Sequence, residues 1–454
     1  MTYRQLLAAN PDFRRLWTGQ VVSEIGDWLN NIAVLALAIQ LAGDSGVGLA
    51  IAVYAIARHV PLFVFGPVAG VVADRLDRRR VMIAADVLRA VLALGFLLAD
   101  RLQSLAVIYA VAASLFAVAS FFSSARRASI PNIVRGPDEL LTANALTSST
   151  FAATVAVGSA LGGVVAAFVA RDIIFVVNAL TFLASAEMIR RIRGRLSRRD
   201  ERSQTESLEA SDDARAFEGA AKTSSLLAQL GAVLRRAAGE FREGLRYVRG
   251  SSVLSAVFVV TAGWGLGNGA ARALYSIFGA RLGVEAMDGS EWVARGYVER
   301  PTDFGISVLF VAMGVGGIVG AALARRFNRG EHLGPRIGRS MVFDGLALSV
   351  FSLMPNLWGA ALLLVAREIN FAIWWTAQQT LVMRTTDDAY AGRVFATSET
   401  LTTLMMVGSM LASGAASDRL GIRPVALAGG VVIACSGMLW FVLTRLPREA
   451  QRAT

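Results

Sequence analysis

Residues 47–81 read VGLAIAVYAIARHVPLFVFGPVAGVVADRLDRRRV, a long apolar stretch that runs directly into a basic loop. The apolar part, Val47–Ala73, exceeds the roughly 20 residues that an α-helix needs to cross a hydrocarbon core of about 30 Å. Four arginines lie in the loop Asp74–Arg80, and basic loops of membrane proteins face the cytoplasm. The stretch therefore predicts a transmembrane helix that ends on the cytoplasmic side.

Similar apolar stretches recur along the chain and predict twelve transmembrane helices in two sets of six. The first set is expected near Phe13–Leu41, Val47–Ala73, Val81–Ala99, Ser104–Ser124, Leu141–Val169 and Ile173–Ile189. The second set is expected near Val253–Leu282, Phe304–Ala324, Ser340–Met354, Leu357–Met383, Val394–Ser417 and Val425–Leu443. Basic residues cluster at both termini and in alternate loops, which predicts a multi-pass protein of the cytoplasmic (inner) membrane with both termini in the cytoplasm.

Composition supports a membrane protein and argues against an enzyme. Of the 454 residues, 55% are hydrophobic and 17% are charged. The net charge of +11 comes from arginines in short loops at helix ends, so orientation in the membrane explains it better than a nucleic-acid partner does. Cys435 is the only cysteine, and His59 and His332 are the only histidines, so no cluster of these residues can hold a metal. We expect no catalytic site, metal or cofactor.

The segment between the two sets of helices differs sharply in composition. It opens with RRIRGRLSRRDER (residues 190–202) and continues through acidic, serine-rich sequence, which is typical of a mobile linker. Further on, apolar residues such as Leu226, Leu230 and Leu234 share one helical face. They predict either an amphipathic helix at the membrane surface or a simple lead-in to the seventh span. We therefore expect a bundle over 1–190, a cytoplasmic bridge over 191–250 and a second bundle over 251–454.

An internal repeat relates the two sets of helices. Gly66 and Gly70 align with Gly316 and Gly320 at a shift of 250 residues, and the same shift superposes TSST (residues 147–150) on TSET (residues 397–400). Because each set holds six spans, equivalent helices share one orientation in the membrane. The predicted fold is therefore an all-α membrane protein of two pseudo-symmetric six-helix bundles with a cavity between them.

The loop after the second span carries a recognisable motif. Gly70, Asp74, Arg75, Arg78 and Arg79 resemble the signature cytoplasmic loop of the major facilitator superfamily. The segments SEIGDW (23–28), FFSSARRASIPNIVRGPDELLTANAL (121–146) and EGLRYVRGS (243–251) are similar to the subgroup of drug, macrolide-type and siderophore exporters. GSALGG (158–163) resembles the exporter motif GPxxGG with serine in place of proline, so close packing by its glycines is expected.

The resemblance implies transport by alternating access, in which the loop latches the two halves together on the cytoplasmic side. Asp74 would accept hydrogen bonds from Arg78, and Arg126 and Glu399 are expected at the same gate. The alternative is that the arginines only orient the protein in the membrane.

Ionisable groups inside membrane spans are costly and point to function. Asp27 lies near the middle of the first span, and helical rise places Arg58 of the second span at a similar depth, which predicts an ion pair. Its carboxylate could exchange a proton for substrate, or the pair could be purely structural. Asp86 and Arg89, one turn apart, and Glu368 are further candidates for proton coupling, although Asp86 and Arg89 could simply pair with each other.

Other polar and aromatic side chains predict a substrate cavity. The candidates are Asn31, Trp374, Trp375, Gln378 and Gln379, which together would suit an amphipathic organic molecule. Alternatively, the two tryptophans fill a helix interface. The sequence thus predicts a monomeric, proton-coupled exporter of a small drug-like or siderophore-like molecule, surrounded by membrane lipid. A lysophospholipid transporter and a non-transporting membrane sensor or scaffold are the alternatives.

Overall fold

The computed structural model describes residues 1–43, 46–168, 171–194, 196, 239, 241–295, 300–328 and 333–450. The regular structure of these residues is entirely α-helical. The amphipathic helix predicted around Leu226 and Leu234 lies outside the described residues. Residues 241–249 are helical, and the Tyr247 hydroxyl donates a hydrogen bond to Asp387 Oδ2 at 3.0 Å. The end of the bridge therefore packs against the start of a helix of the second set.

Twelve long helices in the described part of the chain match the twelve predicted spans. The first bundle contains α2 (Pro11–Ala42), α3 (Val47–Arg75), α4 (Arg78–Arg101), α5 (Leu105–Ile133), α6 (Pro137–Phe168) and α7 (Arg171–Arg190), preceded by the short α1 (Tyr3–Ala9). The second contains α10 (Ser252–Met287), α12 (Pro301–Phe327), α13 (Leu333–Leu353), α14 (Leu357–Thr385), α15 (Asp388–Leu420) and α16 (Ile422–Ala450), with α11 (Glu291–Ala294) in a loop. The all-α membrane fold is thus confirmed, and its division at residues 190 and 250 stays a prediction.

Eleven of the described helices are long and apolar enough to cross a membrane. The remaining long helix, α13, carries Arg336, Arg339 and Asp344 within its 21 residues. It packs between α14 and α16, and its Asp344 is ion-paired inside the bundle rather than exposed to lipid. The charges that lower its hydropathy therefore do not prevent it from serving as a member of the bundle.

Helix ends follow from local sequence. The Asn10 side chain accepts a hydrogen bond from the Phe13 N–H at 3.0 Å, and Pro11 begins α2. Asp77 caps α4 by accepting from the Arg80 N–H at 3.0 Å. Gly421, with φ of +87°, ends α15 and turns the chain into α16. Asp77 of the basic motif thus has a structural role as a helix cap.

Glycines bring helices of one bundle into close contact. A methyl group added at Gly158 of α6 would lie 2.7 Å from Trp28 Cβ, and one at Gly162 would lie 3.2 Å from Ile32 Cγ1. The close packing predicted for Gly162 is therefore confirmed, and α6 continues without a proline through the buried Ser159. The surroundings of Gly163 are outside the described side chains.

Gly305 gives the sharpest test of this packing, because a methyl group there would lie 2.5 Å from Gly283 Cα where α12 crosses α10. We expect Gly305→Ala to destabilise the protein by about 1–3 kcal/mol, the usual cost of overpacking a close contact. Thermal unfolding of the detergent-solubilised protein measures the effect. Gly66→Ala is the matched control, since an added methyl group meets nothing within 4 Å; equal melting temperatures for the two variants would contradict the prediction.

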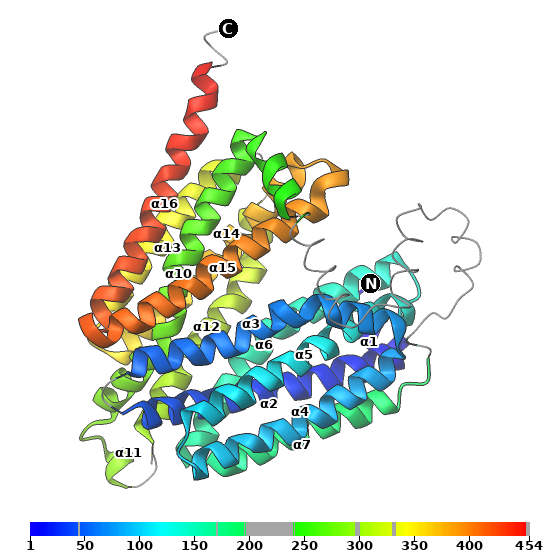
Figure 1. Cartoon of the computed structure of the whole chain (residues 1–454), viewed down its shortest axis with the longest axis vertical. Helices are drawn as coiled ribbons and strands as arrows, with labels where there is room; N and C mark the ends of the chain where they lie inside the picture. The colour runs from blue at the N-terminus through cyan, green and yellow to red at the C-terminus, as the bar shows by residue number, and fades with distance from the viewer. Residues whose placement is uncertain are drawn as a thin grey trace.

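The two bundles meet at one end and diverge toward the other, as Figure 1 shows. We call these ends the α11 end, after the helix found there, and the bridge end, after residues 191–194 and 241–249, the described parts of the bridge. Contacts between the bundles run mainly through α6 with α12 and α3 with α15. Near the α11 end, Gly48 of α3 lies so close to Gly414 and Ser417 of α15 that no methyl group would fit. The bundles are therefore closed against each other at the α11 end.

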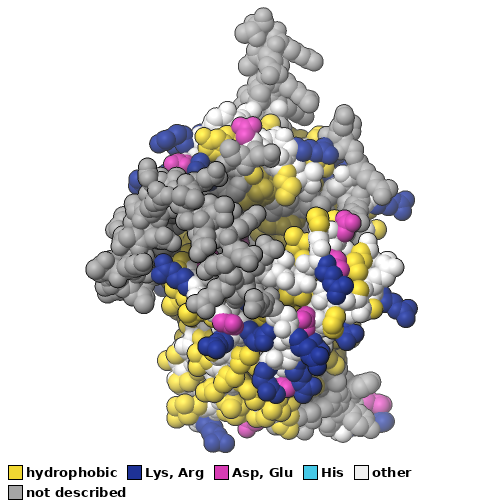
Figure 2. Space-filling view, turned by 90° about the vertical axis from the view of Figure 1, so that its right-hand side faces the viewer, with side chains coloured by type: hydrophobic (Ala, Val, Ile, Leu, Met, Phe, Trp, Pro, Cys, Tyr) yellow, Lys and Arg dark blue, Asp and Glu magenta, His cyan; other side chains and the backbone are white. Residues whose placement is uncertain are grey.

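Along α3 this contact is lost toward the bridge end. Leu62, Phe63 and Phe65 are exposed, and nothing lies within 4 Å of a methyl group added at Gly66 or Gly70. Figure 2 shows the face of the molecule at the bridge end of the first bundle, where basic side chains gather among apolar ones. Gly66 and the motif residue Gly70 thus have free space beside them in this conformation.

Candidate functional site

A cavity of about 200 Å³ lies inside the first bundle. Four polar residues of α2 follow one helical face toward it with spacings of three or four residues, and they are Gln20, Glu24, Asp27 and Asn31. Three arginines from other helices join the first three in its lining, namely Arg58 of α3, Arg89 of α4 and Arg126 of α5. Trp28, Phe116, Phe122 and Phe151 supply apolar faces. The site therefore combines charges of both signs with aromatic walls.

Arg89 forms the electrostatic centre of this cavity. Its Nη2 lies 2.7 Å from Asp27 Oδ2, and its Nη1 lies 3.1 Å from Asp86 Oδ1. The Asp86 side chain is fully buried, whereas that of Asp27 is 26% exposed. The guanidinium also lies 4.0 Å from the centroid of the Phe182 ring. One buried cation is thus shared by two carboxylates, only one of which the cavity can reach.

The ion pair predicted between Asp27 and Arg58 is therefore not the one that the structure forms. Depth in the membrane alone allowed either Arg58 or Arg89 to be the partner of Asp27. The rotation of α4 about its axis brings Arg89 to Asp27. The alternative in which Asp86 and Arg89 pair with each other one turn apart is confirmed.

Arg58 is held by neutral groups. Its guanidinium donates a hydrogen bond to Asn31 Oδ1, which also accepts from the Tyr54 hydroxyl at 3.3 Å. The guanidinium lies 4.8 Å from the Phe116 ring centroid and 5.8 Å from those of Trp28 and Tyr54. No carboxylate among the described residues lies within the 4.0 Å of an ion pair to Arg58. Asn31, predicted in the cavity wall, is buried and positions this cation.

A second hydrogen-bond network of polar side chains lies one helical turn closer to the bridge end. Gln20 accepts from Arg126 and donates to Glu24 Oε1 at 2.7 Å, and Thr154 donates to Glu24 Oε2 at 2.9 Å. Arg126 was predicted at the gate, and here its side chain lines the cavity. Glu399 is exposed and forms no ion pair with a described residue. Neither Gln20 nor Glu24 was predicted, although their spacing from Asp27 places them on its helical face.

The motif loop ties together the bridge end of the first bundle. Arg78 donates to the carbonyl oxygens of Ala73 at 3.0 Å and Ala128 at 2.7 Å, and Arg79 donates to that of Gly194 at 2.7 Å. The predicted contact between Arg78 and Asp74 is long, at 3.5 Å, and the Asp74 side chain is 72% exposed. Asp74 is therefore available for a further partner in this conformation.

The second bundle contains a buried network of its own. Arg367 of α14 lies 3.0 Å from Asp344 of α13, donates to Asn268 of α10 at 2.8 Å and also donates to the Tyr275 hydroxyl. Asp344 and Arg367 are almost completely buried. The network joins three helices through a buried carboxylate, whereas Glu368 beside it is half-buried.

The predicted cavity residues of α14 are divided between two environments. Trp374 is 1% exposed and its ring centroid lies 5.1 Å from that of Trp264, and Gln378 is also buried. Trp375 is 36% exposed and Gln379 is half-buried. The alternative in which tryptophans fill a helix interface thus fits Trp374, while Trp375 and Gln379 remain accessible.

Charged residues also close the α11 end, and this role was not predicted from the sequence. Arg171 Nη2 of α7 lies 3.2 Å from Asp303 Oδ1 of α12, with side chains 9% and 0% exposed, and Gln40 of α2 accepts from Arg171 Nη1 at 2.5 Å. Asp418 of α15 accepts from the Gly48 and Leu49 N–H groups of α3 at 2.7 and 3.0 Å. The Arg171–Asp303 and Asp418 contacts join the first bundle to the second.

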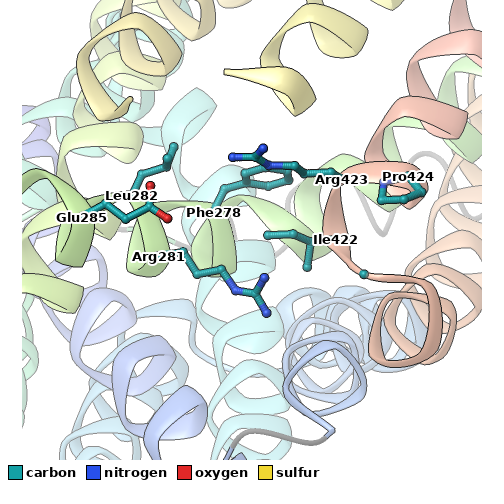
Figure 3. A pocket seen from close by; sticks show the side chains of 8 residues that line it. Phe278, Arg281, Leu282, Glu285, Ile422, Arg423 and Pro424 are labelled. Atoms are coloured by element: carbon teal, nitrogen blue, oxygen red, sulfur yellow. The ribbon is translucent and has the colours of Figure 1, made fainter. Parts of the chain in front are cut away.

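A second cavity, of about 380 Å³, opens where the end of α10 meets the start of α16 (Figure 3). Its charged side chains, Arg281, Glu285 and Arg423, are all exposed. It lies at the surface of the α11 end and has no part in the charge network of the first bundle.

Two helical bundles that pack together at one end, with a charged cavity inside the first, are an architecture typical of membrane transporters. The chain belongs to the Major Facilitator Superfamily, whose family model matches residues 16–407. The prediction of a transporter and not an enzyme is thereby confirmed.

Two relatives of the chain carry the names of exporters, and a third is named as an uncharacterized transporter. BacE of Bacillus subtilis, named as a putative bacilysin exporter, is 24% identical over 94% of this chain and 92% of its own. Macrolide efflux protein A of Streptococcus pyogenes is 35% identical over 17% of this chain and 18% of its own. The match to the MFS-type transporter YfiS of Bacillus subtilis, at 29% identity, covers 38% of this chain and 40% of YfiS. Similarity to the exporter subgroup, predicted from the sequence, is confirmed.

The fold is also found in solved structures. A mutant of the peptide transporter POT superposes with a TM-score of 0.64 over 99% of this chain and 98% of its own, at 11% identity. The nucleoside transporter NupG superposes with a TM-score of 0.60 over 95% of this chain and 99% of its own, at 12% identity. At these identities the likeness concerns the fold alone.

Proposed function

We propose that this chain is a secondary active exporter that moves a small amphipathic molecule across the cytoplasmic (inner) membrane in exchange for protons. The observation that carries this proposal is the partly exposed Asp27 carboxylate in the cavity of the first bundle, in a molecule whose bundles are in contact at the α11 end. The names of BacE and macrolide efflux protein A support export. The bridge end and both termini face the cytoplasm in this proposal, which agrees with the basic residues found there.

Asp27 is the proton-coupling residue, with Arg89 in place of Arg58 as its partner. Removing the charge of one partner of a buried pair normally leaves the other unpaired, at a cost of several kcal/mol. Arg89 avoids that cost, because fully buried Asp86 stays 3.1 Å away when Asp27 takes up a proton. Asp27 can therefore change its charge during transport while Arg89 remains neutralised. Glu368 lies beside the corresponding network of the second bundle and is a secondary candidate.

Two sets of contacts alternate in closing the ends. The outer latch consists of the Arg171–Asp303 pair and the Asp418 cap on α3, and it holds the α11 end shut in the present conformation. The inner gate consists of Gly70, Asp74, Arg75, Arg78, Arg79, Arg126 and Glu399. The free space beside Gly70 and the exposure of Asp74 leave room for the second bundle to approach. Opening of the outer latch accompanies closure of the inner gate.

Uptake into proteoliposomes tests the function. Protein reconstituted into liposomes that are acidic inside should accumulate an amphipathic dye such as ethidium or dansylglycine, and a protonophore should abolish the accumulation. Transport of a fluorescent lysophospholipid without either dye would favour the lipid transporter. Absence of uptake with every probe, in liposomes that contain folded protein, would leave the sensor or scaffold and overturn the proposal.

A further inference from the structure

One arginine of the cavity forms no ion pair with a described residue. Among the described residues, no chain of hydrogen bonds links it to a carboxylate either. Arg89 has Asp27 and Asp86, and Arg126 connects to Glu24 through Gln20. Arg58 contacts the amide oxygen of Asn31, the Tyr54 hydroxyl and aromatic rings. It feels the charge of Asp27 across the cavity without an ion pair to it. From this difference we infer that Arg58 is an anion-binding site, and that the transported substrate carries a carboxylate or a similar anionic group beside an apolar body. The inference rests on the proposed function, because it places the substrate in this cavity.

Burial makes the unpaired charge of Arg58 informative. A cation inside a membrane span is costly unless it is paired or faces water. Arg171 and Arg367, which are more deeply buried, lie within 3.2 Å of a carboxylate. Arg58 is half-buried at the cavity wall, and its Nε is buried without a hydrogen-bond partner among the described residues. An incoming anion supplies the missing counter-charge.

The geometry of Arg58 suits a carboxylate. A guanidinium binds a carboxylate through two parallel N–H donors and does so better than a lysine ammonium. Asn31 accepts from Nη1 and Nε is buried, so Nη2 is the donor that a ligand in the cavity meets first, and Nε joins it only after the side chain shifts. Neutral groups hold the guanidinium in place, so binding needs no prior rupture of an ion pair.

The surrounding walls determine the rest of the substrate. The rings of Phe116 and Trp28 lie 4.8 and 5.8 Å from the guanidinium, and Phe151 packs edge-on to Trp28 at 6.2 Å. They offer apolar faces next to the anion site. Asp27 and Glu24 lie four and seven residues from Asn31 on α2, or about 6 and 10 Å along the helix, and their negative charges disfavour a second anionic group there. The substrate class is therefore an amphipathic molecule with a single anionic group near an aromatic or apolar body.

A pair of fluorescent probes that differ only in charge tests the inference. Dansylglycine carries a carboxylate, and dansylglycinamide carries a neutral amide in its place. Binding to the purified protein is measured by the change in dansyl fluorescence. We expect at least about tenfold tighter binding of the carboxylate probe, because a hydrogen bond to a charged group is stronger than one between neutral groups. Arg58→Met should remove this preference while retaining the affinity for the amide, and Arg58→Lys should restore part of it. Arg281→Met, at the exposed surface cavity, is the control that keeps the preference.

Three results would overturn the inference. The wild-type protein could bind the two probes with equal affinity, it could bind neither probe, or Arg58→Met could keep the preference for the carboxylate probe. Melting temperatures of all variants establish that each is folded. The binding assay needs no proton gradient, so its result is separate from that of the uptake assay. A preference for the carboxylate probe without proton-driven uptake would leave the anion site standing and contradict the exporter.

Discussion

Asp27→Asn is expected to abolish proton-driven accumulation of substrate while leaving the protein folded. The amide retains the size of the side chain and can still accept a hydrogen bond from Arg89, whose charge stays neutralised by Asp86 at 3.1 Å. It can neither lose nor gain a proton, so the cycle that exchanges protons for substrate cannot be completed. Downhill exchange of substrate, which needs no net proton movement, should persist.

Everted membrane vesicles give the measurement, with accumulation of dansylglycine followed after energisation. Asp172→Asn is the matched control, because it makes the same substitution at an exposed position at the start of α7. Its uptake should equal that of the wild-type protein. Accumulation by Asp27→Asn at the wild-type rate would remove Asp27 from the coupling mechanism.

Asp303→Asn is expected to open the outer latch. The change leaves Arg171 buried without its ion-pair partner, and breaking a buried pair by removing one charge costs about 3–5 kcal/mol. Because the pair joins α7 to α12, this cost falls on the conformation that is closed at the α11 end. The equilibrium between the two conformations should therefore shift toward the one that is open at that end.

A cysteine at position 417 reports on this shift. Ser417 of α15 is 6% exposed and faces Gly48 of α3, so Ser417→Cys should react slowly with a membrane-impermeant maleimide applied from outside. In the Asp303→Asn background its labelling rate should rise by at least about tenfold, since a shift of only 1.4 kcal/mol changes a population ratio by about that factor. Glu291→Gln, an exposed neutralisation in α11 at the same end, is the control and should leave the rate unchanged. An equally slow rate in Asp303→Asn would mean that the pair does not hold the bundles together.

The candidate coupling carboxylate, Asp27, could be predicted from the sequence, but its partner, Arg89, could not. Asp27 stands out because a charge in the middle of an apolar stretch is costly. Depth along a helix is a single coordinate, however, and it could not decide between Arg58 and Arg89. The choice depends on how far each helix is rotated about its axis, which is set by packing such as that of Gly158 on Trp28. Glu24 was missed as well, although it lies one turn away on the same face.

The contacts of the outer latch could not be predicted from the sequence, for a different reason. Arg171, Asp303 and Asp418 lie at helix ends, where hydropathy alone cannot distinguish a solvated loop charge from a buried contact. Asp303 is fully buried only because α7 and α12, which are 132 residues apart at this contact, meet across the two bundles. Asp418 similarly finds the free N–H groups at the start of α3. Such contacts follow from the relative placement of the bundles.

The number and order of the long helices, in contrast, could be predicted. Eleven of the twelve long helices in the described part of the chain are long and apolar enough to cross the membrane, and no tertiary contact is needed to recognise them. For α13 only the apolar part, Ser340–Met354, could be recognised; the helix begins seven residues earlier, at Leu333, and includes Arg336 and Arg339, which lie before the predicted span. Hydropathy thus defines the framework, and packing decides which charged side chains meet within it.

Distances between spin labels at the two ends of the molecule test alternating access most directly. With Cys435 replaced by serine, one protein carries labels at Leu49 and Leu420 at the α11 end, and another carries labels at Leu76 and Gly392 at the bridge end; all four positions are exposed. We predict a short distance at the α11 end and a long one at the bridge end, and a reciprocal change of both in Asp303→Asn. Distances that stay fixed, or an α11 end that opens without approach at the bridge end, would contradict alternating access.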